Sequence, residues 1–123
     1  MLSKLEQFKL DVLKDLRVSE LTESGWYNGI HELGFEFIGY EVWLNISNDN
    51  LLELLDIESV EESTFKSQEN LDLIALYMSN KLDDVSIYYY EDSHNNYYGT
   101  FRHEILDDSD LYDMLLKEFR EIR

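Results

Sequence analysis

The sequence predicts an α+β fold, in which a small antiparallel sheet of three to four strands carries helices on one face. Apolar residues recur at helical spacing near both ends and in the middle of the chain, and polarity alternates in segments between them. Tight, turn-rich connections favour antiparallel pairing. Because no repeat or flexible linker divides the chain, we treat residues 1–123 as a single domain, long enough to bury a core without disulfide bonds.

The first predicted element is an N-terminal helix that begins after Ser3. Ser3 and Glu6 have the spacing of a capping box, in which two side chains satisfy backbone N–H groups of the first turn. The apolar positions that follow have helical spacing: Leu5, Phe8, Val12, Leu13 and Leu16. We expect this helix to end near Arg17, where basic side chains suit the helix dipole.

The next residues predict one clear strand after a turn-rich segment. Residues 19–34 contain three glycines, and at most a short strand is expected at Trp26–Glu32. The segment Phe35–Ser47 alternates in polarity and predicts one half-buried strand. Its predicted inward face holds Ile38, Tyr40, Val42, Leu44 and Ile46.

The middle of the chain predicts a second helix, and the pattern of the residues before that helix leaves their secondary structure open. Residues 48–66 fit either a loop or a short helix through Leu55, capped by Asp49 or Asn50. Within them, residues 58–62 are expected in an exposed loop or helix end. A firmer helix follows Ser67, its predicted N-cap, with an inward stripe of Leu71, Ile74, Ala75, Met78 and Leu82.

Residues 83–104 predict a β-hairpin that combines five tyrosines with five carboxylates. A three-residue loop, His94–Asn96, pairs Tyr89 with Phe101 and places the apolar residues on one face: Val85, Ile87, Tyr89, Phe101 and Ile105. A two-residue loop would put Ile87 opposite Glu104, so the three-residue loop is preferred. The opposite face then holds Tyr88, Tyr90, Tyr98, Thr100, Arg102 and Glu104. These tyrosines are core if another layer covers that face, and surface if none does.

A C-terminal helix completes the predicted order of elements. Asp108 or Ser109 is its expected N-cap. Its apolar stripe is Tyr112, Leu115, Leu116, Phe119 and Ile122.

The net charge of −17 is concentrated in the centre of the chain. Residues 18–101 carry 17 acids and two lysines, whereas residues 1–17 are slightly basic. Such a centre repels nucleic acids and anionic membranes, and it attracts basic protein surfaces. We therefore expect a basic protein partner and no direct binding to nucleic acid or membrane.

Motifs of enzymes and metal sites are missing from the sequence. There is no phosphate-binding glycine loop and no nucleophile elbow. Cysteine is absent, and His94 and His103 among so many acids make no specific metal signature. We expect no catalytic residue, no metal and no cofactor, with a metal-binding enzyme or a structural subunit as less favoured interpretations.

In size, acidity and its mixture of tyrosine and carboxylate, the chain resembles small acidic inhibitors of nucleic-acid enzymes from phages and mobile elements. These are the anti-CRISPR and anti-restriction proteins, many of which mimic DNA. The resemblance implies a non-enzymatic inhibitor that blocks the basic nucleic-acid-binding surface of a nuclease or related defence enzyme. The alternative is an immunity protein or antitoxin that neutralises a cognate nuclease toxin, since residues 85–123 resemble the hairpin-then-helix endings of some toxin-immunity proteins.

The expected contact residues combine aromatic anchors with carboxylates that can pair with arginine and lysine. On the hairpin and in the acidic middle segment they are Tyr88, Tyr90, Glu91, Asp92, Tyr98, Glu104, Glu58, Glu61 and Glu62. The N-terminus has no secretory signal and no run reaches membrane-spanning length, so we expect the cytoplasm of a bacterial host cell.

Overall fold

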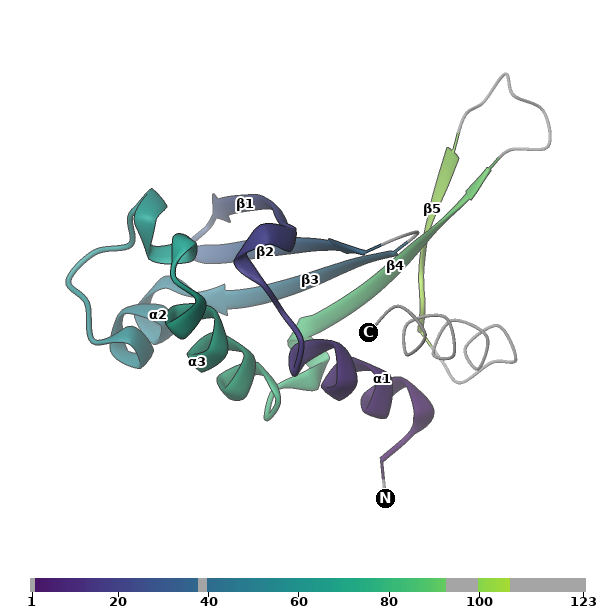
Figure 1. The fold of residues 1–123 in the computed structure, drawn as a ribbon, viewed down its shortest axis with the longest axis horizontal. Coiled ribbons are helices and arrows are strands. Elements are labelled where there is room, and N and C mark those ends of the chain that lie inside the picture. The colour runs from purple at the N-terminus through teal and green to yellow at the C-terminus, as the bar shows by residue number, and fades with distance from the viewer. Residues whose placement is uncertain (1, 38–39, 93–99, 107–123) are drawn as a thin grey trace.

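The computed structural model describes residues 2–37, 40–92 and 100–106, excluding the side chains of residues 23–24, 37, 89–92 and 100–103. It confirms the α+β class: helices pack on one face of an antiparallel sheet (Figure 1). The sheet has five strands where three to four were predicted, and they lie in chain order: β1 Leu21–Tyr27, β2 Ile30–Phe37, β3 Tyr40–Ser47, β4 Val85–Asp92 and β5 Thr100–Glu104. The described helices are α1 Lys4–Leu13, α2 Asn48–Leu55 and α3 Gln68–Met78, with the short 3₁₀ helices η1 Val18–Glu20, η2 Glu62–Lys66 and η3 Leu82–Asp84.

The predicted caps of α1 and α3 are present. The Ser3 hydroxyl accepts a hydrogen bond from the Glu6 N–H, and the Glu6 carboxylate accepts one from the Ser3 N–H, both at 3.1 Å. Ser67 caps α3 in the same sense, by accepting from the Asn70 N–H. The predicted inward stripe of α3 is buried at Leu71, Ile74, Ala75 and Met78, and Leu82 packs against the core from η3.

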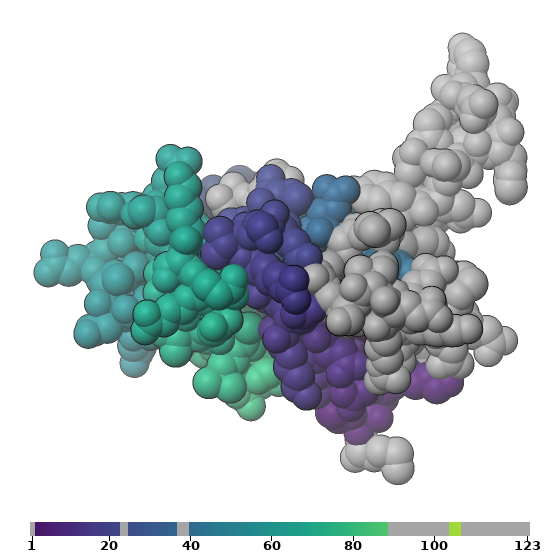
Figure 2. All heavy atoms as spheres, in the orientation of Figure 1, coloured from purple at the N-terminus to yellow at the C-terminus, as the bar shows by residue number. Residues whose placement is uncertain are grey.

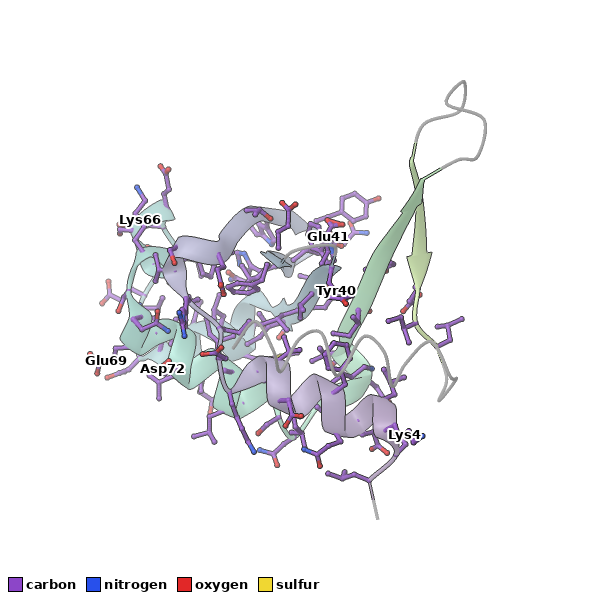
Figure 3. All side chains as sticks on the ribbon, turned by 45° about the vertical axis from the view of Figure 1, so that its right-hand side comes forward. Lys4, Tyr40, Glu41, Lys66, Glu69 and Asp72 are labelled. Atoms are coloured by element: carbon purple, nitrogen blue, oxygen red, sulfur yellow. The ribbon has the colours of Figure 1, made fainter. Side chains whose placement is uncertain are left out.

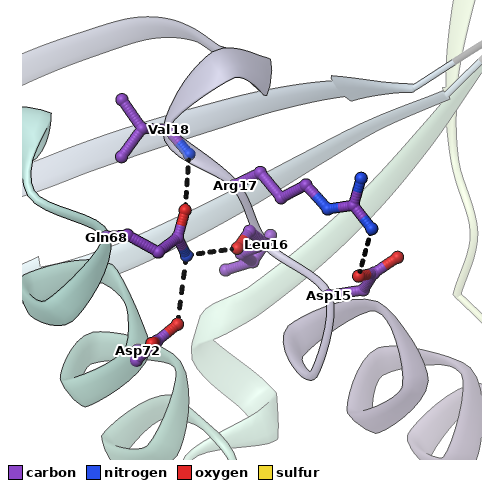
Figure 4. A network of polar contacts seen from close by, with 6 residues as sticks. All are labelled: Asp15, Leu16, Arg17, Val18, Gln68 and Asp72. Atoms are coloured by element: carbon purple, nitrogen blue, oxygen red, sulfur yellow. Dashed lines mark hydrogen bonds and ion pairs between the residues drawn. The ribbon is translucent and has the colours of Figure 1, made fainter.

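Helix α1 ends at Leu13, four residues before the predicted end near Arg17. Leu16 is nevertheless buried, as its apolar character suggested. A glutamine from α3 holds this connection in place: the Gln68 amide accepts from the Val18 N–H at 3.1 Å and donates to the Leu16 carbonyl at 2.8 Å (Figure 4). The spacing of apolar residues near the N-terminus does not reveal these hydrogen bonds, because their partner Gln68 lies on another helix.

The predicted strand Phe35–Ser47 is wrong, because the chain reverses within it. Phe37 pairs with Tyr40, so β2 and β3 form a hairpin. A reversal over two residues changes which sequence parity faces the core: odd residues of β2, such as Phe35, are buried, and even residues of β3, such as Val42, are buried. Tyr40, Val42, Leu44 and Ile46 are buried as predicted, and Ile38 lies outside the described residues.

The predicted short strand Trp26–Glu32 is also wrong, since a tight turn lies at its centre. Tyr27 pairs with Ile30, and the two residues between them, Asn28 and Gly29, have positive φ values of 53° and 75°. A type I′ turn requires positive φ at both central positions, and Asn-Gly is its preferred pair. The segment described above as turn-rich is therefore mostly the β1–β2 hairpin.

Residues 48–66, for which the sequence allowed a loop or a short helix, contain α2. Its N-cap is Ser47 rather than Asp49 or Asn50. The helix ends where Asp56 adopts a left-handed conformation with φ of 54°. Glu58, Glu61 and Glu62 are exposed, as expected for that part.

Where its side chains are described, the β4–β5 hairpin has the predicted faces, but its register differs from the prediction. Tyr89 pairs with His103 and Glu91 with Phe101, a shift of two residues from the predicted partners. A shift of two preserves which side each residue faces. Val85, Ile87 and Ile105 are accordingly buried, and Tyr88 lies opposite Glu104 on the other face. The predicted loop His94–Asn96 and the predicted C-terminal helix from Asp108 or Ser109 lie outside the described residues.

The core lies between the inner face of the sheet and the three helices. Large side chains that are almost fully buried come from every layer, and they are Phe8, Val12, Leu33, Phe35, Val42, Leu44, Leu51, Leu71, Ile74, Met78 and Ile87. Phe8 of α1 meets Tyr40 of β3 edge to face, with ring centroids 6.4 Å apart. Each such burial stabilises the fold by roughly 1.5–3 kcal/mol. None of the helices within the described residues has the length and apolar character needed to cross a membrane.

Gly29→Ala should destabilise the protein by about 1 kcal/mol, because alanine is strained at a left-handed φ. Gly25→Ala is the matched control: a Cβ at either glycine meets no atom within 4 Å, but the φ of Gly25 is outside the left-handed region. The control should be neutral or slightly stabilising. Urea unfolding midpoints measure both variants, and equal midpoints would contradict the assigned turn.

Candidate partner-binding surfaces

One end of the described structure carries eight exposed carboxylates, and we call it the acidic end. It is formed by α2, the loop after it, η2 and the start of α3, which appear in blue-green to teal at one side of Figure 2. Its members are Asp49, Glu53, Asp56, Glu58, Glu61, Glu62, Glu69 and Asp72, all of them exposed. Residues 48–72 contain one basic residue, Lys66, so the net charge of this segment is −7.

Local structure explains why these acids point into solvent. Leu51 and Leu71 turn the apolar stripes of α2 and α3 into the core, which leaves the polar stripes outside. Lys66 lies 3.7 Å from Glu62, but both side chains are highly exposed and such pairs contribute little. Lys66, Glu69 and Asp72 are labelled in Figure 3. The acidic end thus presents carboxylates that basic groups can reach.

The second anionic surface is the outer face of the sheet, which points away from the three helices. Cross-strand pairing places four residues in one row over four strands: Glu36 of β2, Glu41 of β3, Tyr88 of β4 and Glu104 of β5. Glu36 and Glu104 are exposed, and Glu41 and Tyr88 are half-buried. Tyr40 and Glu41, both labelled in Figure 3, leave β3 on opposite sides. None of the helices α1, α2 and α3 covers this row.

Beside this row, the Trp43 side chain lies close to the backbone of Gly34. Gly34 of β2 pairs with Trp43 of β3, and the indole lies across the glycine. A Cβ at Gly34 would come within 2.9 Å of the indole ring. Glycine is therefore required at position 34 for packing. The Trp43 ring lies on the same face of the sheet as Glu36 and Glu41.

The structure separates the predicted contact residues into two groups. Tyr88 and Glu104 lie together on the outer face, whereas Glu58, Glu61 and Glu62 belong to the acidic end. The backbone of Tyr90, Glu91 and Asp92 belongs to β4, but their side chains, and all of Tyr98, lie outside what the structure describes.

The sequence interpretation missed an exposed apolar group at the β1–β2 turn. This hairpin-end patch consists of Trp26, Tyr27 and Ile30, which are 68 %, 74 % and 43 % exposed. Asn28-Gly29 was the available signal, because an Asn-Gly pair between alternating segments indicates a hairpin. With the hairpin recognised, Tyr27 and Ile30 would have been placed opposite each other at its end.

Lys9 is a partly buried cation that connects α1 with η3. Lys9 of α1 donates a hydrogen bond to the Leu82 carbonyl at 2.9 Å. Burial lowers the pKa of the Lys9 ammonium, and the nearby Asp83, Glu104 and Glu6 carboxylates act in the opposite direction. Within residues 2–37, 40–92 and 100–106, no group of three or more His, Asp or Glu side chains is arranged to hold a metal ion.

Comparisons with known proteins give no relative. No protein-family model matches the chain, no curated protein matches its sequence, and no solved structure matches it.

Glu36→Lys should stabilise the fold by about 0.5 kcal/mol, because it replaces a like-charged cross-strand pair with Glu41 by an attractive one. Glu32→Lys is the matched control, since Glu32 is an exposed outer-face residue of the same strand whose partners are Asn45 and Gly25. Thermal unfolding at low and high salt measures both. The advantage of Glu36→Lys should shrink as salt screens the pair, and a salt-independent advantage would contradict the electrostatic explanation.

Proposed function

We propose that this protein is a non-enzymatic acidic inhibitor that covers the basic nucleic-acid-binding surface of a nuclease or related defence enzyme. The carrying observation is the acidic end, where eight exposed carboxylates share one segment with a single lysine. Arginine and lysine residues that normally contact phosphates can form charge-assisted hydrogen bonds with carboxylates instead. In this proposal the protein takes the place of the nucleic acid, as a DNA mimic of the anti-CRISPR or anti-restriction type does.

The arrangement of the carboxylates favours a large flat partner over a small ligand. They are spread over α2, η2 and α3, and a further acidic row crosses the outer face of the sheet. A long-range negative field of this kind speeds the encounter with a basic surface. It also opposes direct binding to nucleic acid, whose phosphates carry the same sign. We place this activity in the cytoplasm of a bacterial host cell, where such enzymes meet foreign nucleic acid.

The partner should be found by affinity capture from a bacterial host at low and high salt, followed by competition with the purified enzyme. We expect a basic nucleic-acid enzyme to be recovered at low salt and lost at high salt. The protein should displace labelled nucleic acid from it, and displacement should weaken as salt rises. An enzyme that binds the protein and its nucleic acid simultaneously would overturn the proposal. If the captured partner were a nuclease toxin, the protein would be an immunity protein that uses the same acidic surface against that toxin.

The contributing surface can be located with two triple variants that each remove three negative charges. Glu58, Glu61 and Glu62 are changed to Gln at the acidic end, and Glu32, Glu36 and Glu104 are changed to Gln on the outer face. All six side chains are exposed, so both variants should fold. We expect the first variant to lower the association rate constant by about tenfold, because local charge steers the encounter. The second should lower it less, and the reverse order would place the contact on the outer face.

A further inference from the structure

The hairpin-end patch places two large aromatic side chains in solvent beside the acidic end. Trp26 is 68 % exposed and Tyr27 is 74 % exposed, on opposite sides of the end of the β1–β2 hairpin. Binding surfaces commonly use tryptophan and tyrosine as anchors that carry much of the binding energy.

The indole of Trp26 is held in place from one side. It stacks on the imidazole of His31, with ring centroids 5.6 Å apart and planes within 9° of parallel. His31 is buried, its Nε2 lies 2.8 Å from the Asn48 Oδ1, and its ring packs against Phe65. The ring contacts from Phe65 through His31 to Trp26, the first tilted and the second stacked, therefore connect the exposed indole to the core. One face of the indole meets His31, and its high exposure leaves the opposite face to solvent.

The same contacts join the patch to two acidic segments of the chain. Phe65 belongs to η2, which begins at Glu62 and follows Glu61, and Figure 1 shows this short helix next to the end of β1. Asn48 begins α2 and is followed by Asp49, and its N–H donates to the Gly29 carbonyl at 2.8 Å. Asp49, Glu61 and Glu62 are exposed, so the two segments that support the hairpin end also carry carboxylates close in the chain to Asn48 and Phe65.

We propose that the hairpin-end patch binds an arginine-rich segment of the partner protein. One guanidinium stacks on the solvent face of Trp26, and neighbouring basic side chains pair with Asp49, Glu61 and Glu62. Tryptophan is the best aromatic partner for a cation, and arginine stacks on aromatic faces better than lysine does. Charge complementarity selects this occupant, because a nucleic acid or an anionic membrane would meet the carboxylates of Asp49, Glu61 and Glu62 with the same sign. The inference rests on the proposed function and identifies the contact through which a basic enzyme is held.

The fixed geometry of Trp26 adds to its value as an anchor. A side chain already held by stacking loses little conformational freedom when a partner binds. The Asn28-Gly29 turn and the hydrogen bond from Asn48 fix the end of the hairpin in the same way. The patch is thus arranged before the partner arrives.

The test compares an oligo-arginine with an oligo-lysine peptide of equal length, titrated calorimetrically into the full chain at about 0.15 M salt. Oligo-arginine should bind more tightly. Trp26→Ala should weaken oligo-arginine binding by about three- to tenfold, and oligo-lysine binding by less than about twofold. Leu76→Ala is the matched control, because Leu76 is also 68 % exposed but lies on α3, and it should change neither affinity. Trp26→Leu keeps an apolar side chain but removes the aromatic face, and it should behave like Trp26→Ala. It replaces the alanine variant in the titrations if that variant folds poorly.

A second readout places the peptide on the protein directly. The chain has two tryptophans, so its ¹H–¹⁵N spectrum should show two indole N–H signals, which Trp26→Leu assigns. Oligo-arginine should shift the Trp26 signal and leave the Trp43 signal in place. Equal losses for both peptides, or a shift confined to Trp43, would overturn the inference.

The outcomes distinguish this inference from the proposed function. If a basic enzyme is bound and its nucleic acid displaced, but Trp26→Ala changes neither peptide nor enzyme affinity, the inhibitor proposal stands and the patch is not the contact. If Trp26-dependent arginine binding is found but no nucleic-acid enzyme is inhibited, the patch is a site for basic segments and the inhibitor proposal fails.

Discussion

The structure depends on the burial of one face of a five-stranded sheet against three helices. Every other feature follows from this one-sided arrangement, because each strand must send its apolar residues to the same side. The two-residue reversals in the β1–β2 and β2–β3 hairpins change the parity of the inward residues, from His31, Leu33 and Phe35 in β2 to Val42 and Leu44 in β3. The polar residues between them are then collected on the outer face.

The one-sided core also explains how the chain tolerates a net charge of −17. The carboxylates of residues 49–72 lie on the exposed stripes of α2 and α3 and in the loop between them, where water screens their repulsion. The acids of the outer face are spread along a row across the strands, with Tyr88 between Glu41 and Glu104. The fold therefore keeps charge out of the core at the cost of a strongly anionic surface, and that surface is what the proposed function uses.

The β1–β2 hairpin connects the core with both proposed contact regions. His31 is a buried polar residue whose ring nitrogen meets Asn48 of α2, while its ring lies between Trp26 and Phe65. A histidine in this position joins the sheet to α2 and η2 and supports an exposed indole at the same time. The anionic segment and the aromatic anchors are adjacent because these contacts bring β1, α2 and η2 together.

The sequence by itself determined the α+β class, the capped helices at Ser3 and Ser67, the buried stripe of α3 and the faces of the described hairpin residues Val85, Ile87, Tyr88, Glu104 and Ile105. These features depend on local spacing, which is set by the geometry of helices and strands. The exposure of Glu58, Glu61 and Glu62 was predicted from the charge of residues 58–62, which were expected in a loop or helix end. The Asn28-Gly29 signal was also present in the sequence, although residues 19–34 were interpreted only as turn-rich, with at most a short strand at Trp26–Glu32.

Tertiary structure decided the features that depend on distant partners. The reversal between Phe37 and Tyr40 changes the buried positions from odd residues in β2 to even residues in β3, and the contacts of β2 with β1 and β3 establish where one strand ends and the next begins. The two-residue shift of β5 against β4 preserves both faces, so polarity alone could not distinguish the two registers. Trp26 and His31 are cross-strand partners in one hairpin, but the contact of His31 with Phe65 joins residues far apart in the chain, and no local pattern encodes a contact of that range.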